Sequence, residues 1–186
     1  TVAVGNVSAL GLGEVALNGG SLDLGGLAVT NSISANGTAT LQNAGAYAGA
    51  LSIKAGTLTL SGGLKADVTL NGGTLKNTSA LTLASGQALV FNGGNVSGAI
   101  TTADGAELIM QQNGSISGNL TLDGGSLSLN GLQLSVGGSL IINDTFDIIL
   151  DSDLQPGGTY TLITTGSGIT GDLSQLVAVS DALNSR

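Results

Sequence analysis

Cysteine, histidine and tryptophan are absent from this chain of 186 residues, and proline occurs once. Without cysteine, no disulfide can stabilise the fold. Without cysteine and histidine together, Cys-His and Ser-His-Asp nucleophilic sites are excluded, and so are nearly all zinc and copper sites. No apolar run reaches the ~18 residues that a membrane-spanning helix needs. We therefore expect no resident metal or cofactor of these kinds and no direct insertion of this chain into a bilayer.

Charged residues are also scarce, at 9% of the chain, where globular domains carry about 25%. The 4 basic and 12 acidic residues give a net charge of −8. Binding to a phosphate backbone requires clustered Lys and Arg, so we expect no nucleic-acid partner. The lysines, Lys54, Lys65 and Lys76, are expected to be outward and solvated.

Glycine is abundant instead, with 32 residues, many of them in pairs between short apolar runs. Glycine adopts positive φ without steric cost, so such pairs mark corners of the chain. One phrase returns three times at a step of twenty residues, in residues 94–102 (GNVSGAITT), 114–122 (GSISGNLTL) and 134–142 (LSVGGSLII). A fixed step of this size predicts a solenoid, in which each coil buries its apolar face against its neighbours.

Within each coil the local period is two, because aliphatic residues alternate with Ser or Thr between Gly and Asn. This alternation is typical of β-strands and leaves no amphipathic helix between residues 50 and 150. The pattern predicts three inward ladders: Leu75, Val96, Ile116 and Val136; Leu58, Leu81, Ile100, Leu120 and Leu140, with Leu60, Leu83, Leu122 and Ile142 beside them; and Val68, Leu89, Leu108 and Leu127, with Leu70, Phe91, Met110 and Leu129. The sequence thus predicts an all-β fold, a parallel β-helix with three strands and about 20 residues per coil.

The coils are expected to occupy residues 1–155, followed by an irregular or capping segment over residues 156–186. Residues 1–50 keep the alternation but hold the twenty-residue step poorly. Residues 43–50 (NAGAYAGA), which carry Tyr47, are interpreted as a loop that bulges from a corner. Asn71, Asn92 and Asn130 follow strands of the third ladder, and we expect them to form a structural amide ladder at the corners.

Clustered carboxylates are the one feature that could support chemistry. Asp104 and Asp123 lie nineteen residues apart and are expected on successive coils; glycoside hydrolysis needs two carboxyl groups about 5–10 Å apart. Asp144, Asp147, Asp151 and Asp153 form a denser set and are weak calcium candidates, since calcium prefers hard oxygen ligands. A solubilising acidic end is the alternative for this set. We assign no catalytic or cofactor-binding residue.

The repeated GGxLxL phrasing, the Asn-Gly corners and the closing GGTYTLITTGSGITGDLSQL resemble bacterial autotransporter passenger domains and the related autotransporter-associated β-strand repeat proteins. The resemblance covers about residues 50–175. It implies a right-handed parallel β-helix that is secreted to the outer membrane and the cell surface, where it serves as an adhesin, a stalk or a self-associating fibre. These residues are not expected to include the family's translocator barrel, so we expect no outer-membrane insertion by this chain, and no catalytic motif of the family maps onto it.

The leading hypothesis is a non-enzymatic, extracellular structural or adhesive β-solenoid on a bacterial cell surface. Its expected partners are further copies of itself, in head-to-tail or lateral contact, because an exposed strand edge templates the next strand. A host or matrix glycan or protein is a further partner. Two alternatives remain open: a glycan-acting β-helix enzyme that uses the clustered aspartates, and a glycan- or calcium-binding module without turnover.

Overall fold

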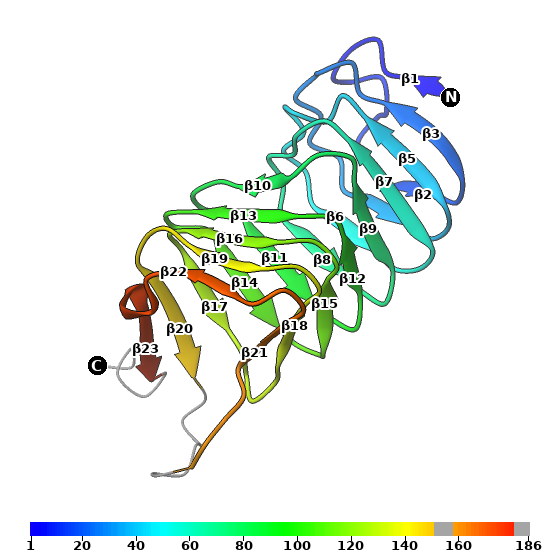
Figure 1. The fold of residues 1–186 in the computed structure, drawn as a ribbon. Helices are drawn as coiled ribbons and strands as arrows, with labels where there is room; N and C mark the ends of the chain where they lie inside the picture. Colours follow the sequence, from blue (N-terminus) through cyan, green and yellow to red (C-terminus); the bar gives the residue numbers. More distant parts are fainter. Residues whose placement is uncertain (151–157, 181–186) are drawn as a thin grey trace.

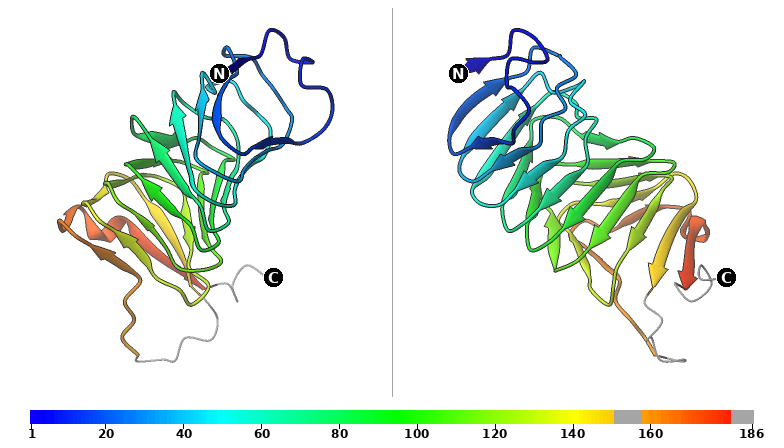
Figure 2. Two further views of the ribbon diagram at one scale, coloured as in Figure 1. Left: turned by 90° about the vertical axis from the view of Figure 1, so that its right-hand side faces the viewer. Right: turned by 180° about the vertical axis from the view of Figure 1, so that it is seen from behind.

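The chain is a β-solenoid with almost no helix. The computed structural model describes residues 1–150 and 158–180. Its strands are all paired in parallel and form three sheets of nine, nine and five strands. The coils stack along one axis, with β1 and β23 at opposite ends of the rod (Figure 1). The two further views show the strands of each sheet lying side by side along the stack (Figure 2). The predicted parallel β-helix with three strands per coil and about 20 residues per coil is confirmed.

Two sheets run the full length of the rod. Sheet A consists of β1 (Val2–Ala3), β3 (Gly20–Asp23), β5 (Ala39–Gln42), β7 (Thr57–Ser61), β9 (Thr74–Asn77), β12 (Asn95–Ser97), β15 (Gly114–Ile116), β18 (Leu134–Val136) and β21 (Ile163–Thr165). Sheet B consists of β2 (Val15–Leu17), β4 (Ile33–Ala35), β6 (Leu51–Ile53), β8 (Val68–Leu70), β11 (Ala88–Phe91), β14 (Glu107–Met110), β17 (Ser126–Ser128), β20 (Phe146–Leu150) and β23 (Leu176–Ser180).

Sheet C exists only in the second half of the rod. Its strands are β10 (Leu81–Leu83), β13 (Ile100–Ala103), β16 (Leu120–Asp123), β19 (Leu140–Ile142) and β22 (Ile169–Gly171). β10 forms the edge that faces the N-terminal coils (Figure 1). The one helical element in the described part of the chain is the 3₁₀ turn η1 (Leu173–Gln175). No described helix is long or apolar enough to cross a membrane.

The core is a continuous column of mostly aliphatic side chains from Val4 to Ile148, and it also contains Tyr47, Phe91 and Phe146. Strand register aligns the predicted ladders, with Leu75, Val96, Ile116 and Val136 stacked in sheet A. Leu81, Ile100, Leu120 and Leu140 stack in sheet C, and Val68, Leu89, Leu108 and Leu127 stack in sheet B. Each side chain in these three ladders is buried.

Leu58 and Leu60 are exceptions to the predicted ladders. They were expected beside Leu81 and Leu83, but β7 belongs to sheet A, where Leu58 pairs with Leu75 and Leu60 with Asn77. The step from Leu58 to Leu75 is only 17 residues, because the chain crosses from β7 to β8 in the six residues 62–67. A short crossing leaves no room for a strand of sheet C.

Residues 43–50 lack a strand, but they do not bulge outward as expected. They close the third side of their coil, and Tyr47 is fully buried in the core. The Tyr47 hydroxyl donates to the carbonyl oxygen of Asn31 or Ala50, each 2.8 Å away. Burial raises the pKa of Tyr47 to about 12. The tyrosine thus fills the space that a ladder residue fills elsewhere.

Asn77 marks the point where sheet C begins. Its side-chain amide donates to the carbonyl oxygens of Ser79 and Ala99, each at 2.7 Å, while its own Oδ1 is buried without a partner. Gly98, in the next coil, has a φ of +147° and lies against this amide, so that a Cβ there would overlap it. The corner can therefore form only with glycine at position 98.

The segment after residue 155 was expected to be irregular or capping. In the described part of it, β21, β22 and β23 instead extend sheets A, C and B by one further strand each. The exposed apolar residues Ile169, Leu173 and Val177 lie in this last coil. The coil departs from the repeat in length, since Leu134 pairs with Ile163, 29 residues later.

Candidate functional site

Six acidic residues of the second half lie along one corner of the rod. They occupy or flank the turns that join sheet C to sheet B, and we call this set the acidic corner: Asp104, Glu107, Asp123, Asp144, Asp147 and Asp172. Register explains the alignment, because Glu107 pairs with Ser126 and Ser126 with Asp147. These two carboxylates thus lie on the same column, two coils apart, with a serine between them.

A shallow hollow of about 190 Å³ opens on this corner, and Asp104, Glu107 and Asp147 contribute to its lining. Glu107 and Asp147 lie two strands apart, which corresponds to roughly 9.5 Å between their backbones. Asp104 and Asp123 do fall on successive coils as predicted, since Asp123 pairs with Ala103. Asp123, however, does not line the hollow; its Oδ1 accepts a hydrogen bond from the Asn143 amide at 2.7 Å.

The calcium candidates are only partly described. Asp144 and Asp147 lie at the start of β20, and the Asp144 carboxylate accepts a hydrogen bond from the Thr145 amide at 2.7 Å. Asp151 and Asp153 lie outside the described residues. Within residues 1–150 and 158–180, no three carboxylates come close enough to hold a metal ion. The acidic corner therefore has no preformed cation cage in this part of the chain.

Three carboxyl groups have a resolved pKa change, and only Asp172 among them belongs to the acidic corner. Hydrogen bonding to Ser34, with Lys54 nearby, lowers the pKa of Glu14, and the Asn43 amide lowers the pKa of Asp23. The Ser174 backbone and side chain lower the pKa of Asp172, which caps η1. A general acid needs a raised pKa, so these three groups act as local caps rather than as proton donors.

The amide corners are structural. The Asn92 amide donates to Asn71 Oδ1 at 2.9 Å, and the Asn71 amide donates to Ser52 Oγ at 2.9 Å. The predicted ladder does not continue to Asn130, whose amide donates to the Met110 carbonyl at 2.7 Å instead. The three lysines are exposed as predicted, and Lys54 lies 3.7 Å from Glu14.

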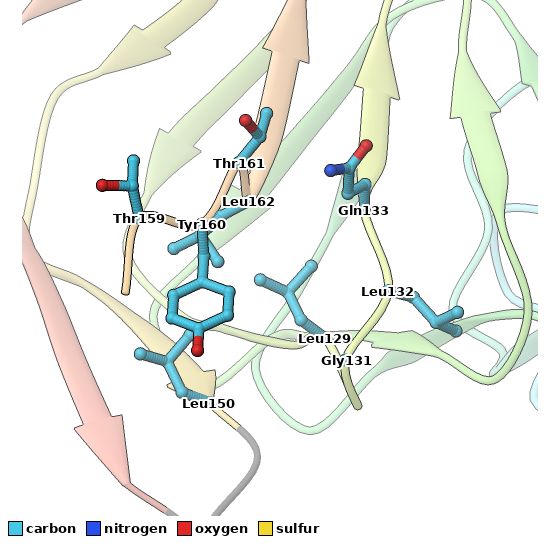
Figure 3. A pocket seen from close by; sticks show the side chains of 9 residues that line it. All are labelled: Leu129, Gly131, Leu132, Gln133, Leu150, Thr159, Tyr160, Thr161 and Leu162. Carbon is cyan, nitrogen blue, oxygen red and sulfur yellow. The ribbon is translucent and has the colours of Figure 1, made fainter. Parts of the chain in front are cut away.

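A second hollow, of about 310 Å³, lies near the C-terminal end, where sheet B turns into sheet A. Its lining residues come from residues 129–133, from the end of β20 and from the approach to β21 (Figure 3): Leu129, Gly131, Leu132, Gln133, Leu150, Thr159, Tyr160, Thr161 and Leu162. Sequence reasoning did not find this hollow. Two features of the sequence could have indicated it: the long corner at 129–133 and Tyr160, one of two tyrosines in the chain.

At both ends of the described part of the rod, the outermost strands have a neighbour on one side only. At the N-terminal end, β1 and β2 each pair with a strand on one side, and Val2, Val7 and Leu12 are exposed nearby. At the C-terminal end, β21, β22 and β23 are the outermost described strands of their sheets. Unpaired strand edges present backbone donors and acceptors to a further strand.

Comparison with known proteins finds no matching family model, no matching curated protein and no matching solved structure. The fold and its surfaces are therefore the basis for a functional argument.

Proposed function

We propose that this chain is a non-enzymatic structural and adhesive rod segment of a bacterial cell surface, a stalk or part of a self-associating fibre. The observation that supports it most strongly is the pair of nine-stranded parallel sheets that run the length of the rod and end in open edges. The sequence resemblance to secreted passenger domains supports the surface location. Detection of the chain by antibody on intact cells tests that location.

The interior supports a mechanical rather than a chemical role. The described core is hydrophobic from end to end and holds four buried polar residues: Asn31, Ser34, Gln87 and Thr102. Three of these four bind backbone carbonyls through their own side chains, as the Thr102 hydroxyl does with Gly124 at 2.8 Å. These polar groups are used to hold the coils together, which leaves the interior without a reactive group.

Self-association follows from the open edges. Parallel sheets A and B end at β21 and β23 on one copy and begin at β1 and β2 on the next, so a head-to-tail contact continues both sheets. Sheet C cannot continue in this contact, because the N-terminal coils lack a sheet C strand and β22 meets no counterpart. The expected interface therefore pairs two of the three edges.

Sedimentation velocity over a concentration series tests this association. Ala178 pairs with Ile148 on the core side of β23 but is exposed at the open end. Ala178→Lys places a charge where the next copy would bury it, and we expect at least about tenfold weaker association. Gln111→Lys makes the same charge change at an exposed corner in the middle of the rod and should associate like the parent chain. A parent chain that stays monomeric at all concentrations contradicts the fibre role.

The hollow on the acidic corner favours a second candidate, a glycan-acting or calcium-binding surface. Asp104, Glu107 and Asp147 line one depression, and paired carboxylates are the machinery of glycoside hydrolysis. Asp104→Asn and Glu107→Gln should each abolish release of reducing sugar if this candidate is right. Calorimetry with calcium, with and without chelator, tests the binding alternative. No sugar release and no calcium binding would leave the structural role.

A further inference from the structure

The turn from sheet B to sheet A changes its geometry near the C-terminal end. In three successive coils it takes three residues, 71–73, 92–94 and 111–113. Gly73, Gly94 and Gly114 stack there in register, and a Cβ on Gly94 would lie 2.7 Å from the Leu70 Cβ. In the next coil this register position is Leu134, which is buried. The glycine column that keeps the turn narrow therefore ends at this coil.

In this coil the turn is wider and takes the five residues 129–133. The hollow of about 310 Å³ lies between this wide turn, the end of β20 and the residues 159–162 that lead into β21. Its size is at the lower end of the range of small-ligand sites, roughly 300–1,000 Å³. Loops that depart from a regular scaffold are where binding residues concentrate.

The lining of this hollow combines an apolar floor with neutral polar groups. Leucines supply the apolar surface, and the ring of Tyr160 lies toward Leu129 and Leu150 (Figure 3). Thr159, Thr161 and Gln133 add two hydroxyls and one amide around it. Tyr160 keeps 43% of its surface exposed. None of the lining residues that the structure describes is charged, although the chain carries a net charge of −8.

We propose that this hollow binds one neutral hexopyranose residue of a glycan. The face of an aromatic ring is electronegative, so it attracts the polarised C–H bonds on the apolar face of a pyranose ring. The hydroxyls and the amide pair with sugar hydroxyls, whose unmatched burial would be costly. An anionic sugar would find no cation in the lining and would be repelled by the net negative charge of the rod. The inference rests on the adhesive part of the proposed function and names its ligand class.

Saturation-transfer NMR on the full chain tests the inference, with maltotetraose, cellotetraose, mannotetraose and galactotetraose as neutral probes and tetragalacturonate as the anionic probe. At least one neutral probe should receive magnetisation, and tetragalacturonate should not. Tyr160→Ala should weaken that binding at least about tenfold, whereas Tyr160→Phe, which keeps the ring, should retain it. Circular dichroism verifies that the variants are folded.

A matched pair of glutamines separates the hollow from the rest of the surface. Gln133→Ala, in the wide turn, should weaken binding of the neutral probe, while Gln112→Ala, in the narrow turn one coil earlier, should leave it unchanged. Failure of every neutral probe, equal binding of tetragalacturonate, or full binding by Tyr160→Ala overturns the inference. Sedimentation of the same samples reports rod association independently, so loss of sugar binding alone leaves the fibre role standing.

Discussion

The N-terminal coils and the C-terminal coils close the same pair of sheets in different ways. From β9 onward, a strand of sheet C lies between each strand of sheet A and the following strand of sheet B. Before β9, the chain crosses through residues 4–14, 24–32, 43–50 and 62–67 without a strand. A parallel β-solenoid therefore needs two sheets to stack, and the third side can be built by other means.

In the N-terminal coils those other means are buried aliphatic residues such as Leu24, Val29 and Leu64, together with two hydrogen-bonded side chains. The Asn31 amide donates to the Gly13 carbonyl at 2.7 Å and to the Gly11 carbonyl at 3.1 Å. Tyr47 donates in turn to Asn31 or Ala50. In the C-terminal coils, backbone hydrogen bonds between sheet C strands hold the third side together. A side-chain hydrogen bond joins two particular residues, whereas the backbone hydrogen bonds of a sheet can recur in every coil. This explains why only the second half keeps a regular step.

Charge divides the molecule in the same way. In residues 1–93, three acidic residues balance three lysines, while residues 94–186 hold nine acidic residues and one arginine. The described acidic residues of the second half all lie on the acidic corner. The net charge of −8 thus belongs to the three-sheet half. Like charges directly opposite one another on neighbouring strands are destabilising. The regular half avoids such pairs, since Glu107 pairs with Ser126 and Asp123 bonds to Asn143.

The largest expected effect tests whether the two halves are separate units. Tyr47→Ala removes a fully buried ring and its hydrogen bond, and should lower the free energy of unfolding by about 3–5 kcal/mol. Because each coil contacts only its neighbours, the damage should stay in the N-terminal coils. Hydrogen exchange should show lost amide protection in β4, β5 and β6, with β13, β16 and β19 still protected.

Lys65→Ala serves as the control for this experiment, since Lys65 is exposed and its truncation should change stability by less than about 0.5 kcal/mol. A loss of protection spread evenly over all three sheets would show that the rod unfolds as one unit. The two halves would then differ in geometry but not in stability.

The second expected effect is alkaline loss of stability through the same residue. The pKa of Tyr47 is raised to about 12 in the fold, from about 10 for an unfolded tyrosine. The neutral phenol stabilises the fold fully below pH ~10, and this contribution is lost as the pH rises toward 12, by about 2–3 kcal/mol in total. Ultraviolet titration of tyrosinate in a Tyr160→Phe variant isolates the Tyr47 ionisation. Tyr47→Phe should lack this alkaline transition, and native-state ionisation near pH 10 would contradict the burial.

Much of the regular half could be predicted from sequence, because alternation and a constant step together define both the face and the sheet of each residue. Val96, Ile116 and Val136 illustrate this, since each step is 20 residues and each side chain is buried. Alternation alone does not identify the sheet. Leu58 was placed in the wrong ladder because the crossing after β7 is short, and period two looks the same in sheets A and C.

The candidate sites were less predictable, for a physical reason. The acidic corner depends on register between neighbouring coils, so Asp104 and Asp123 could be placed on successive coils by counting. Counting could not show that Glu107 and Asp147 share a hollow while Asp123 bonds to Asn143. The hollow near Tyr160 depends on contact between the wide turn 129–133 and the residues 159–162 of the next coil. Neither segment follows the repeat, so their contact could not be found by counting.

The smallest expected effect concerns the stability contributed by a polar residue within a buried ladder of the regular half. Thr102 is fully buried between Leu83 and Leu122 in register, and its hydroxyl donates to the Gly124 carbonyl at 2.8 Å. Thr102→Val keeps the shape but leaves that carbonyl without its donor, so urea unfolding should show a loss of about 1–2 kcal/mol. Thr121→Val, on the outward face of the same sheet, should be neutral within about 0.5 kcal/mol. If Thr102→Val instead stabilises the chain, an apolar residue is more stable than threonine at this ladder position. Side-chain hydrogen bonds would then contribute to stability only in the N-terminal coils.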